Sequence, residues 1–232
     1  MNTISDWEII KNGFDFSYLL DLLSRVIPSL ICITLHELSH GFVAYKLGDD
    51  TARRAGRLTL NPLKHLDPIG LLMMLTVRFG WAKPVPVNMY RFKNPKRGMA
   101  VTALAGPVSN VLITIVFLLL YGALSPFLDG GPTAGEYVLE MLWLTAYMSL
   151  GLAIFNMIPI PPLDGSKVLF SVMDEGGYRG LMRYERYGGL ALMALSWSGL
   201  LSRPLSAAIQ WAFKQLLPIA WWAYDAVAIL FS

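Results

Sequence analysis

The residues best suited to chemistry in this chain are two histidines and a glutamate that lie close together. They are His36, Glu37 and His40, set within an otherwise apolar stretch. On a helix, residues four positions apart share one face, with Cβ atoms about 5–6 Å apart. Two imidazoles at that spacing can bind one zinc ion, and the glutamate can take a proton from an attacking water. The pattern is therefore typical of a helix-borne zinc hydrolase site.

The alternative interpretation is a chance match, in which ordinary hydrogen bonds satisfy both histidines. The composition of the chain argues against it. Of its 232 residues, 55% are hydrophobic and only 15% are charged, and the mean hydropathy is +0.49. These values predict an integral membrane protein. Because an ionisable side chain near the centre of a bilayer costs about 2.5–3.5 kcal/mol on insertion scales, a cluster of such groups there indicates function.

A catalytic zinc ion normally has three protein ligands, so a third is needed. The chain contains only three histidines and one cysteine. Cys32 lies on the same stripe as the histidines, but about 12 Å of helix rise separates it from His40. Cys32 is therefore expected to be a small packing residue.

Asp164 is the preferred third ligand. It follows a proline-rich helix break over residues 158–165, at the inner end of another apolar segment. A carboxylate there would be awkward unless a metal ion neutralised it. The alternatives, His65 and Asp67, are expected in an interfacial loop, where they would make surface contacts and cap a helix.

Asn156 has two possible roles. It lies in the last turn before the prolines, where its side chain could cap carbonyl groups freed by the break at Pro159. It could equally donate a hydrogen bond to the oxyanion of a substrate. The residues alone leave these two roles open.

Three long apolar helices are expected to position these side chains. They cover residues 17–47, 98–124 and 138–157. If the first helix ends at the membrane surface near Gly48, the turn from His36 to His40 lies about 15 Å inside. The first fifteen residues lack the basic start of a cleavable signal peptide, so the first helix should stay in the mature protein.

The charges of the loops predict the orientation. Loops 49–64 and 79–97 are rich in lysine and arginine, whereas loop 125–137 has neither. The positive-inside rule places the basic loops in the cytoplasm. Residues 67–78 are then re-entrant, because they are too short to span and a crossing would export one basic loop. We expect a multi-pass protein of the plasma (inner) membrane, with its site nearer the cytoplasmic side.

Residues 83–88 alternate valine with proline or polar residues, which predicts an edge strand or an extended segment. Strand-like residues 85–89 could pair with an unwound substrate by strand addition; the alternative is a simple structural hairpin. The fold class is thus an all-α polytopic membrane protein with three core helices, peripheral helices and a small membrane-associated β element. Residues 1–232 are expected to form one membrane-embedded domain, with a core at 17–175 and peripheral helices at 188–231, where one or two further spans and an interfacial helix would fit.

Three motifs together resemble the site-2 protease family of intramembrane zinc metalloproteases. Residues 36–40, 105–110 and 156–165 read HELSH, AGPVSN and NMIPIPPLDG, in that order. The resemblance covers about residues 25–175. It implies one zinc ion per chain held by His36, His40 and Asp164, with Glu37 activating water and Asn156 assisting at the scissile carbonyl.

The resemblance further implies that the substrate is a transmembrane protein or peptide, cut within or beside the lipid bilayer, often in signalling. The chain has no room for a PDZ insert or a CBS domain, so regulation by such modules is not expected. One alternative function is a membrane metal transporter, but a pathway needs polar groups at every depth and here they cluster at one. Another is a non-catalytic scaffold of the same fold, although every expected catalytic residue is present. No basic run with interleaved aromatics suggests a nucleic-acid partner.

Overall fold

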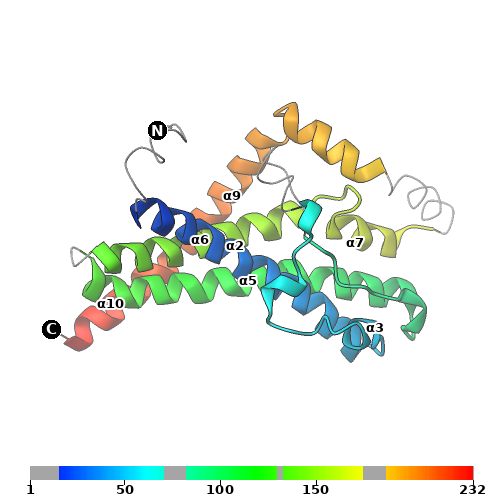
Figure 1. Cartoon of the computed structure of the whole chain (residues 1–232), viewed down its shortest axis with the longest axis horizontal. Helices are drawn as coiled ribbons and strands as arrows, with labels where there is room; N and C mark the ends of the chain where they lie inside the picture. Colours follow the sequence, from blue (N-terminus) through cyan, green and yellow to red (C-terminus); the bar gives the residue numbers. More distant parts are fainter. Residues whose placement is uncertain (1–15, 71–81, 130–132, 175–186, 232) are drawn as a thin grey trace.

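Three long helices form the centre of the molecule. The computed structural model describes residues 16–70, 82–129, 133–174 and 187–231. Helices α2 (Phe16–Lys46), α5 (Pro95–Leu128) and α6 (Thr133–Asn156) lie side by side (Figure 1). Each contains a segment long and apolar enough to cross a membrane, at Leu22–Lys46, Pro95–Leu128 and Ala134–Asn156. The three core helices predicted from the sequence are therefore confirmed.

The helix ends follow from local chemistry. The Asn94 side chain accepts a hydrogen bond from the Arg97 amide, and Pro95 takes the first helical position of α5, where no N–H is needed. Gly48, just beyond α2, has a φ of +107°, which an L side chain rarely adopts. Helix α6 ends three residues before Pro159, which cannot continue a helix.

Helix α5 packs against both α2 and α6. A buried apolar cluster joins Leu118 of α5 to Ala146 and Leu150 of α6. Two C-terminal helices, α9 (Ser202–Leu216) and α10 (Pro218–Phe231), add Phe213 and Ala220 to this cluster. Helix α10 lies along α5.

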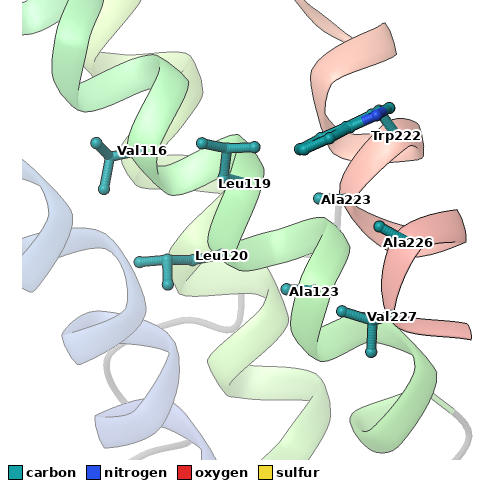
Figure 2. A pocket seen from close by; sticks show the side chains of 8 residues that line it. All are labelled: Val116, Leu119, Leu120, Ala123, Trp222, Ala223, Ala226 and Val227. Carbon is teal, nitrogen blue, oxygen red and sulfur yellow. The ribbon is translucent and has the colours of Figure 1, made fainter. Parts of the chain in front are cut away.

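A groove of about 400 Å³ separates part of α10 from α5 (Figure 2). Its lining is apolar throughout, with Leu119 and Leu120 from α5 and Trp222 from α10. Such a surface suits the hydrocarbon interior of a bilayer. The groove lies well away along α5 from Gly106, which faces the histidines.

Short elements connect the long helices. They are α3 (Thr51–Arg54), the 3₁₀ turns η1 (Pro62–Lys64) and η2 (Met89–Arg91), and α7 (Asp164–Val172), which packs against α5. The predicted β element is wrong for the described ranges, which contain only an isolated antiparallel bridge between Leu66 and Ala82. Because Pro84 and Pro86 have no N–H, residues 83–88 cannot form a regular ladder and are instead extended.

The re-entrant segment predicted at 67–78 lies largely outside the described residues, because its residues 71–78 are not described. That the first helix stays in the mature protein remains a prediction, and residues 1–15, on which it rests, are also outside the described residues. Asp67 caps the helical turn that follows it, as predicted, since its Oδ1 accepts the amides of Ile69 and Gly70 at 2.9 Å. Within residues 187–231, α9 and α10 have 15 and 14 residues, short of the ~20 that a span requires. The further spans predicted there are not found in the described part of the chain.

Candidate metal centre

His36 and His40 lie one turn apart on α2, and both side chains are buried. Their rings are perpendicular, with centroids 4.6 Å apart. The two Nε2 atoms are 3.0 Å from each other. The helical spacing thus brings both imidazoles to a single point.

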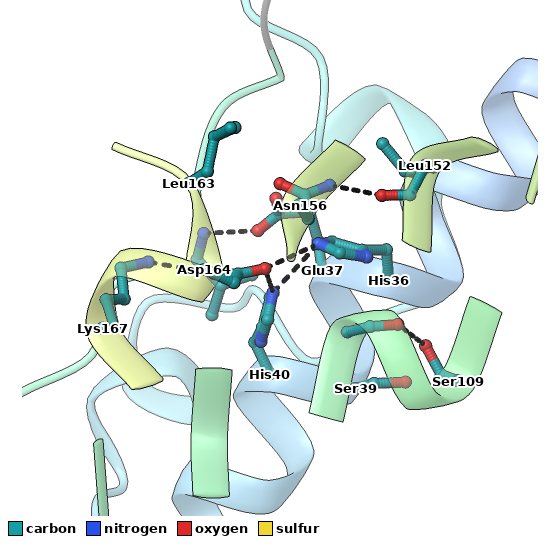
Figure 3. A network of polar contacts seen from close by, with 12 residues as sticks. His36, Glu37, Ser39, His40, Ser109, Leu152, Asn156, Leu163, Asp164 and Lys167 are labelled. Carbon is teal, nitrogen blue, oxygen red and sulfur yellow. Dashed lines mark hydrogen bonds and ion pairs between the residues drawn. The ribbon is translucent and has the colours of Figure 1, made fainter. Parts of the chain in front are cut away.

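Asp164, in the first turn of α7, brings a carboxylate to the same place. Its Oδ2 atom lies 3.2 Å from Nε2 of His36 and 3.0 Å from Nε2 of His40. Figure 3 shows the three side chains directed toward one another. In the ranges that the structure describes, they form the one group of three or more potential His, Cys, Asp or Glu ligands.

The geometry of the three atoms fits a zinc ion. Zinc bonds to histidine nitrogen and carboxylate oxygen are about 2.0–2.2 Å long, so the edges of a zinc tetrahedron measure about 3.3–3.6 Å. The observed separations of 3.0–3.2 Å lie just below that range. Two imidazoles and a carboxylate also leave a fourth position open for water or substrate, as catalytic zinc requires.

A backbone carbonyl sets the orientation of His40. Its Nδ1 lies 2.7 Å from the carbonyl oxygen of Thr102 on α5. Because a carbonyl only accepts, Nδ1 of His40 donates this bond, which leaves Nε2 as the ring nitrogen that can bind a metal. Nδ1 of His36 has no hydrogen-bond partner within the described residues.

Gly106 allows α5 to pass against the two imidazoles. A Cβ atom at this position would lie 2.5 Å from Cε1 of His36 and 2.5 Å from Nε2 of His40. Any side chain here would therefore occupy the space that the rings need.

Asp164 is held in its charged form. Burial opposes ionisation, but hydrogen bonds with His36 and His40 and the charges of His40 and Lys167 outweigh it, so the pKa of this carboxyl lies well below its usual range. Lys167 stands 3.2 Å from Oδ1, the oxygen that faces away from the histidines. The carboxylate thus presents one oxygen to the histidines and the other to a lysine.

Glu37 is not a member of the His–His–Asp cluster, and its role as a base stays a prediction. Its side chain is half-buried, and its Oε2 accepts the backbone N–H of Val85 at 2.9 Å. Among the described residues, Val85 is the hydrogen-bond donor found for this carboxylate.

The other candidates lie elsewhere. The expectation that His65 makes surface contacts is wrong, because its side chain is fully buried and its Nε2 lies 2.9 Å from the carbonyl of Thr59. Cys32 is a buried packing residue, as predicted, with Sγ 3.5 Å from the carbonyl of Thr145. Neither residue belongs to the His–His–Asp cluster.

Asn156 hydrogen-bonds within its own helix. Its Nδ2 donates to the carbonyl of Leu152 at 3.0 Å (Figure 3). Among the described residues it does not cap a carbonyl of the proline-rich segment. A contact with substrate stays a prediction.

Sequence reasoning missed three groups around the site: the Thr102 carbonyl, the Val85 amide and the Lys167 side chain. The first two are backbone groups, which leave no trace in residue type. Lys167 follows Asp164 by three positions on a helix, and that spacing is a signal that could have revealed the pair.

Comparison with known proteins agrees with this geometry. The sequence profile of Peptidase family M50 matches residues 127–196, a stretch that includes Asn156 and Asp164. The chain is 39% identical over 173 residues to "Putative zinc metalloprotease YwhC" of Bacillus subtilis, covering 73% of this chain and 78% of the relative.

Two further relatives carry the same description in their names. MJ0611 of Methanocaldococcus jannaschii is 31% identical over 166 residues, covering 69% of this chain and 78% of that protein. Rip2 of Mycolicibacterium smegmatis is 28% identical over 188 residues, covering 79% of this chain and 70% of that protein. No solved structure matches the chain.

The motifs, the buried cluster and the relatives lead to one conclusion. One of the three candidate membrane spans carries His36, Glu37 and His40, and Asp164 of α7 completes the His–His–Asp group. The chain belongs to Peptidase family M50, the site-2 protease family, and is an intramembrane zinc metalloprotease.

Proposed function

We propose that His36, His40 and Asp164 hold a single zinc ion per chain, and that this centre hydrolyses peptide bonds of transmembrane proteins or peptides. The convergence of Nε2, Nε2 and Oδ2 within 3.0–3.2 Å carries the proposal. Zinc bound there would polarise the scissile carbonyl and make water a stronger nucleophile. Two ligands come from α2 and one from α7, so the site depends on how these helices pack.

A side chain of the protein transfers the proton of the attacking water. Glu37 accepts it from the attacking water and later delivers it to the leaving amine, as a general base and then a general acid. Asn156 donates a hydrogen bond to the substrate oxygen where negative charge develops. Nδ2 of Asn156 carries two hydrogens, so the one that is not bonded to the Leu152 carbonyl can make this bond.

We further propose that residues 1–232 form one membrane-embedded domain in the plasma (inner) membrane, with the site nearer the cytoplasmic side. Two basic loops support this orientation: one follows the end of α2 nearer the histidines, and the other precedes the start of α5 nearer Gly106. The loop between α5 and α6 lacks lysine and arginine. The positive-inside rule then directs the basic end inward.

The test compares the full-length chain with three variants, Glu37→Gln, Asp164→Ala and His65→Ala. Zinc content is measured in detergent, together with cleavage of a panel of fluorogenic peptides, each with a ~20-residue leucine–alanine span broken by glycine, asparagine or proline. We expect Glu37→Gln to retain zinc and lose cleavage, and Asp164→Ala to lose zinc. His65→Ala, which lies outside the cluster, should keep its zinc.

Three outcomes contradict the proposal. If Glu37→Gln still cleaves, Glu37 is not the base. If His65→Ala loses more zinc than Asp164→Ala, Asp164 is not the third ligand. If zinc-loaded wild type cleaves soluble peptides but no member of the membrane panel, the substrate class is wrong.

A further inference from the structure

An extended segment crosses α2 beside Glu37. Residues 83–88 form neither helix nor strand. The backbone N–H of Val85 donates to Oε2 of Glu37 over 2.9 Å, although the two residues are 48 positions apart. This contact is made by the backbone of a connecting segment and not by another side chain of the site.

Both ends of the segment are anchored by buried polar groups. At one end, the Lys83 amide donates to the carbonyl of His65 at 2.9 Å, and Nη2 of Arg57 donates to the Lys83 carbonyl at 2.6 Å. At the other end, the Asn88 amide donates to Oδ2 of Asp49 at 2.6 Å. The side chains of Arg57, His65 and Asp49 are all buried.

Packing fixes the middle of the segment. The Val85 side chain is buried and lies against Gly41, where an added Cβ atom would come 3.1 Å from Cγ1 of Val85. Gly41 is one helical turn after Glu37 and lies on the same face of α2. Val85 thus meets α2 through its side chain at Gly41 and through its amide at Glu37.

The flanking prolines leave Val85 as the single donor. Pro84 and Pro86 have no N–H, and each restricts the residue before it to an extended conformation. The amide of Val85 is therefore the one N–H that residues 84–86 can present to Glu37, and its backbone is pre-organised.

We propose that Val85 is a positioning residue, whose backbone N–H holds one oxygen of the Glu37 carboxylate so that the other faces the attacking water. This inference rests on the proposed role of Glu37 as the base. A hydrogen bond at one oxygen restricts the rotation of the Glu37 carboxylate. Less rotational entropy of this side chain is then lost when the water reacts. The amides of Val85 and Asn88 are already occupied, so strand addition of a substrate would have to use other groups of this segment.

The test removes the amide hydrogen and keeps the extended backbone. Val85→Pro in the full-length chain is compared with wild type, using zinc content and the kcat and KM for a cleaved peptide of the leucine–alanine panel. We expect kcat to fall by about tenfold to a hundredfold, with KM and zinc content unchanged. A purely structural role would instead alter zinc content or KM as well.

Two controls separate the amide from the side chain and from proline itself. Val85→Ala keeps the N–H but loses the packing against Gly41, so its kcat should fall less than that of Val85→Pro. Lys93→Pro places a proline elsewhere in the same connection, at an exposed residue whose preceding Phe92 already has ψ of 143°. Its kcat should match wild type.

If Val85→Pro does not fold, the α-hydroxy acid analogue of valine is incorporated at position 85. It replaces the backbone N–H by an ester oxygen and retains the side chain. The same selective loss of kcat is expected. A wild-type kcat in the proline or ester variant overturns the inference, and so does a raised kcat, which would make the contact an inhibitory latch. If the Val85 variants overturn this inference but Glu37→Gln is inactive, the proposed function still holds. If Glu37→Gln is active, both the proposed function and this inference are wrong.

Discussion

Gly106 of α5 faces His40 of α2 so closely that a methyl group on Gly106 would lie 2.5 Å from Nε2 of His40. The same methyl would lie 2.5 Å from Cε1 of His36. The absence of a side chain at one position of α5 therefore decides whether two imidazoles on α2 can meet.

Gly106→Ala is expected to displace both rings and to lower bound zinc at least tenfold, because second-shell changes of this kind typically weaken metal binding 10–100-fold. Elemental analysis of the purified protein measures the zinc content. Gly151→Ala on α6 is the matched control, since its added Cβ would meet only Ile209 Cδ1 at 3.4 Å, an ordinary contact. Normal zinc content in Gly106→Ala would contradict the prediction.

Lys167→Met tests the partner of Asp164. Nζ of Lys167 lies 3.2 Å from Oδ1 of the aspartate, and Asp164 Oδ2 faces the histidines. Without the lysine the carboxylate can rotate, so zinc affinity should fall about tenfold in competition with a chelator. Lys214→Met, at an exposed position of α9, should leave affinity unchanged. Equal affinity in the two variants would show that Lys167 does not orient Asp164.

Asp49→Ala tests the anchor of the segment beside Glu37. The buried Asp49 carboxylate accepts bonds from the amides of Thr51 and Asn88 and from the Thr51 hydroxyl. Its loss removes these hydrogen bonds, and hydrogen bonds to a charged group contribute about 1.5–3 kcal/mol each. We expect the free energy of unfolding to fall by about 3 kcal/mol in denaturant titrations in detergent.

Asp50→Asn is the control for that measurement. Asp50 pairs with Arg54 and Arg91, but its side chain is 32% exposed, and surface ion pairs contribute about 0–1 kcal/mol. If Asp49→Ala loses no more stability than Asp50→Asn, the buried carboxylate is not the anchor that its contacts indicate.

Gly122→Ala tests the attachment of α10 to α5. A Cβ atom on Gly122 would overlap the backbone carbonyl of Ala220, which cannot move without shifting α10. Overpacking of this kind costs about 1–3 kcal/mol, so the midpoint of thermal unfolding should fall. Gly189→Ala, where an added Cβ meets nothing within 4 Å, should unfold at the wild-type temperature or slightly above it.

Much of the architecture could be predicted, because long apolar segments and helix-ending residues act locally. Helix α2 was expected at residues 17–47 and is observed at Phe16–Lys46. For residues 83–88 the alternating valines and prolines left an edge strand and an extended segment open, and the structure shows an extended segment. Its amides bond to a carbonyl, to the carboxylate of the half-buried Glu37 and to that of the buried Asp49, and these contacts depend on residues far away in the chain.

The sequence by itself determined that His36, Glu37 and His40 belong to one membrane helix, because their spacing and the helical period are local properties. It also favoured Asp164 as the partner of the two histidines. Only the tertiary structure decided that these atoms meet within 3.0–3.2 Å, that Gly106 makes room for them, and which groups orient them. The orienting groups at Thr102 and Val85 are backbone atoms common to nearly every residue, so their roles arise from position in the fold and not from side-chain identity.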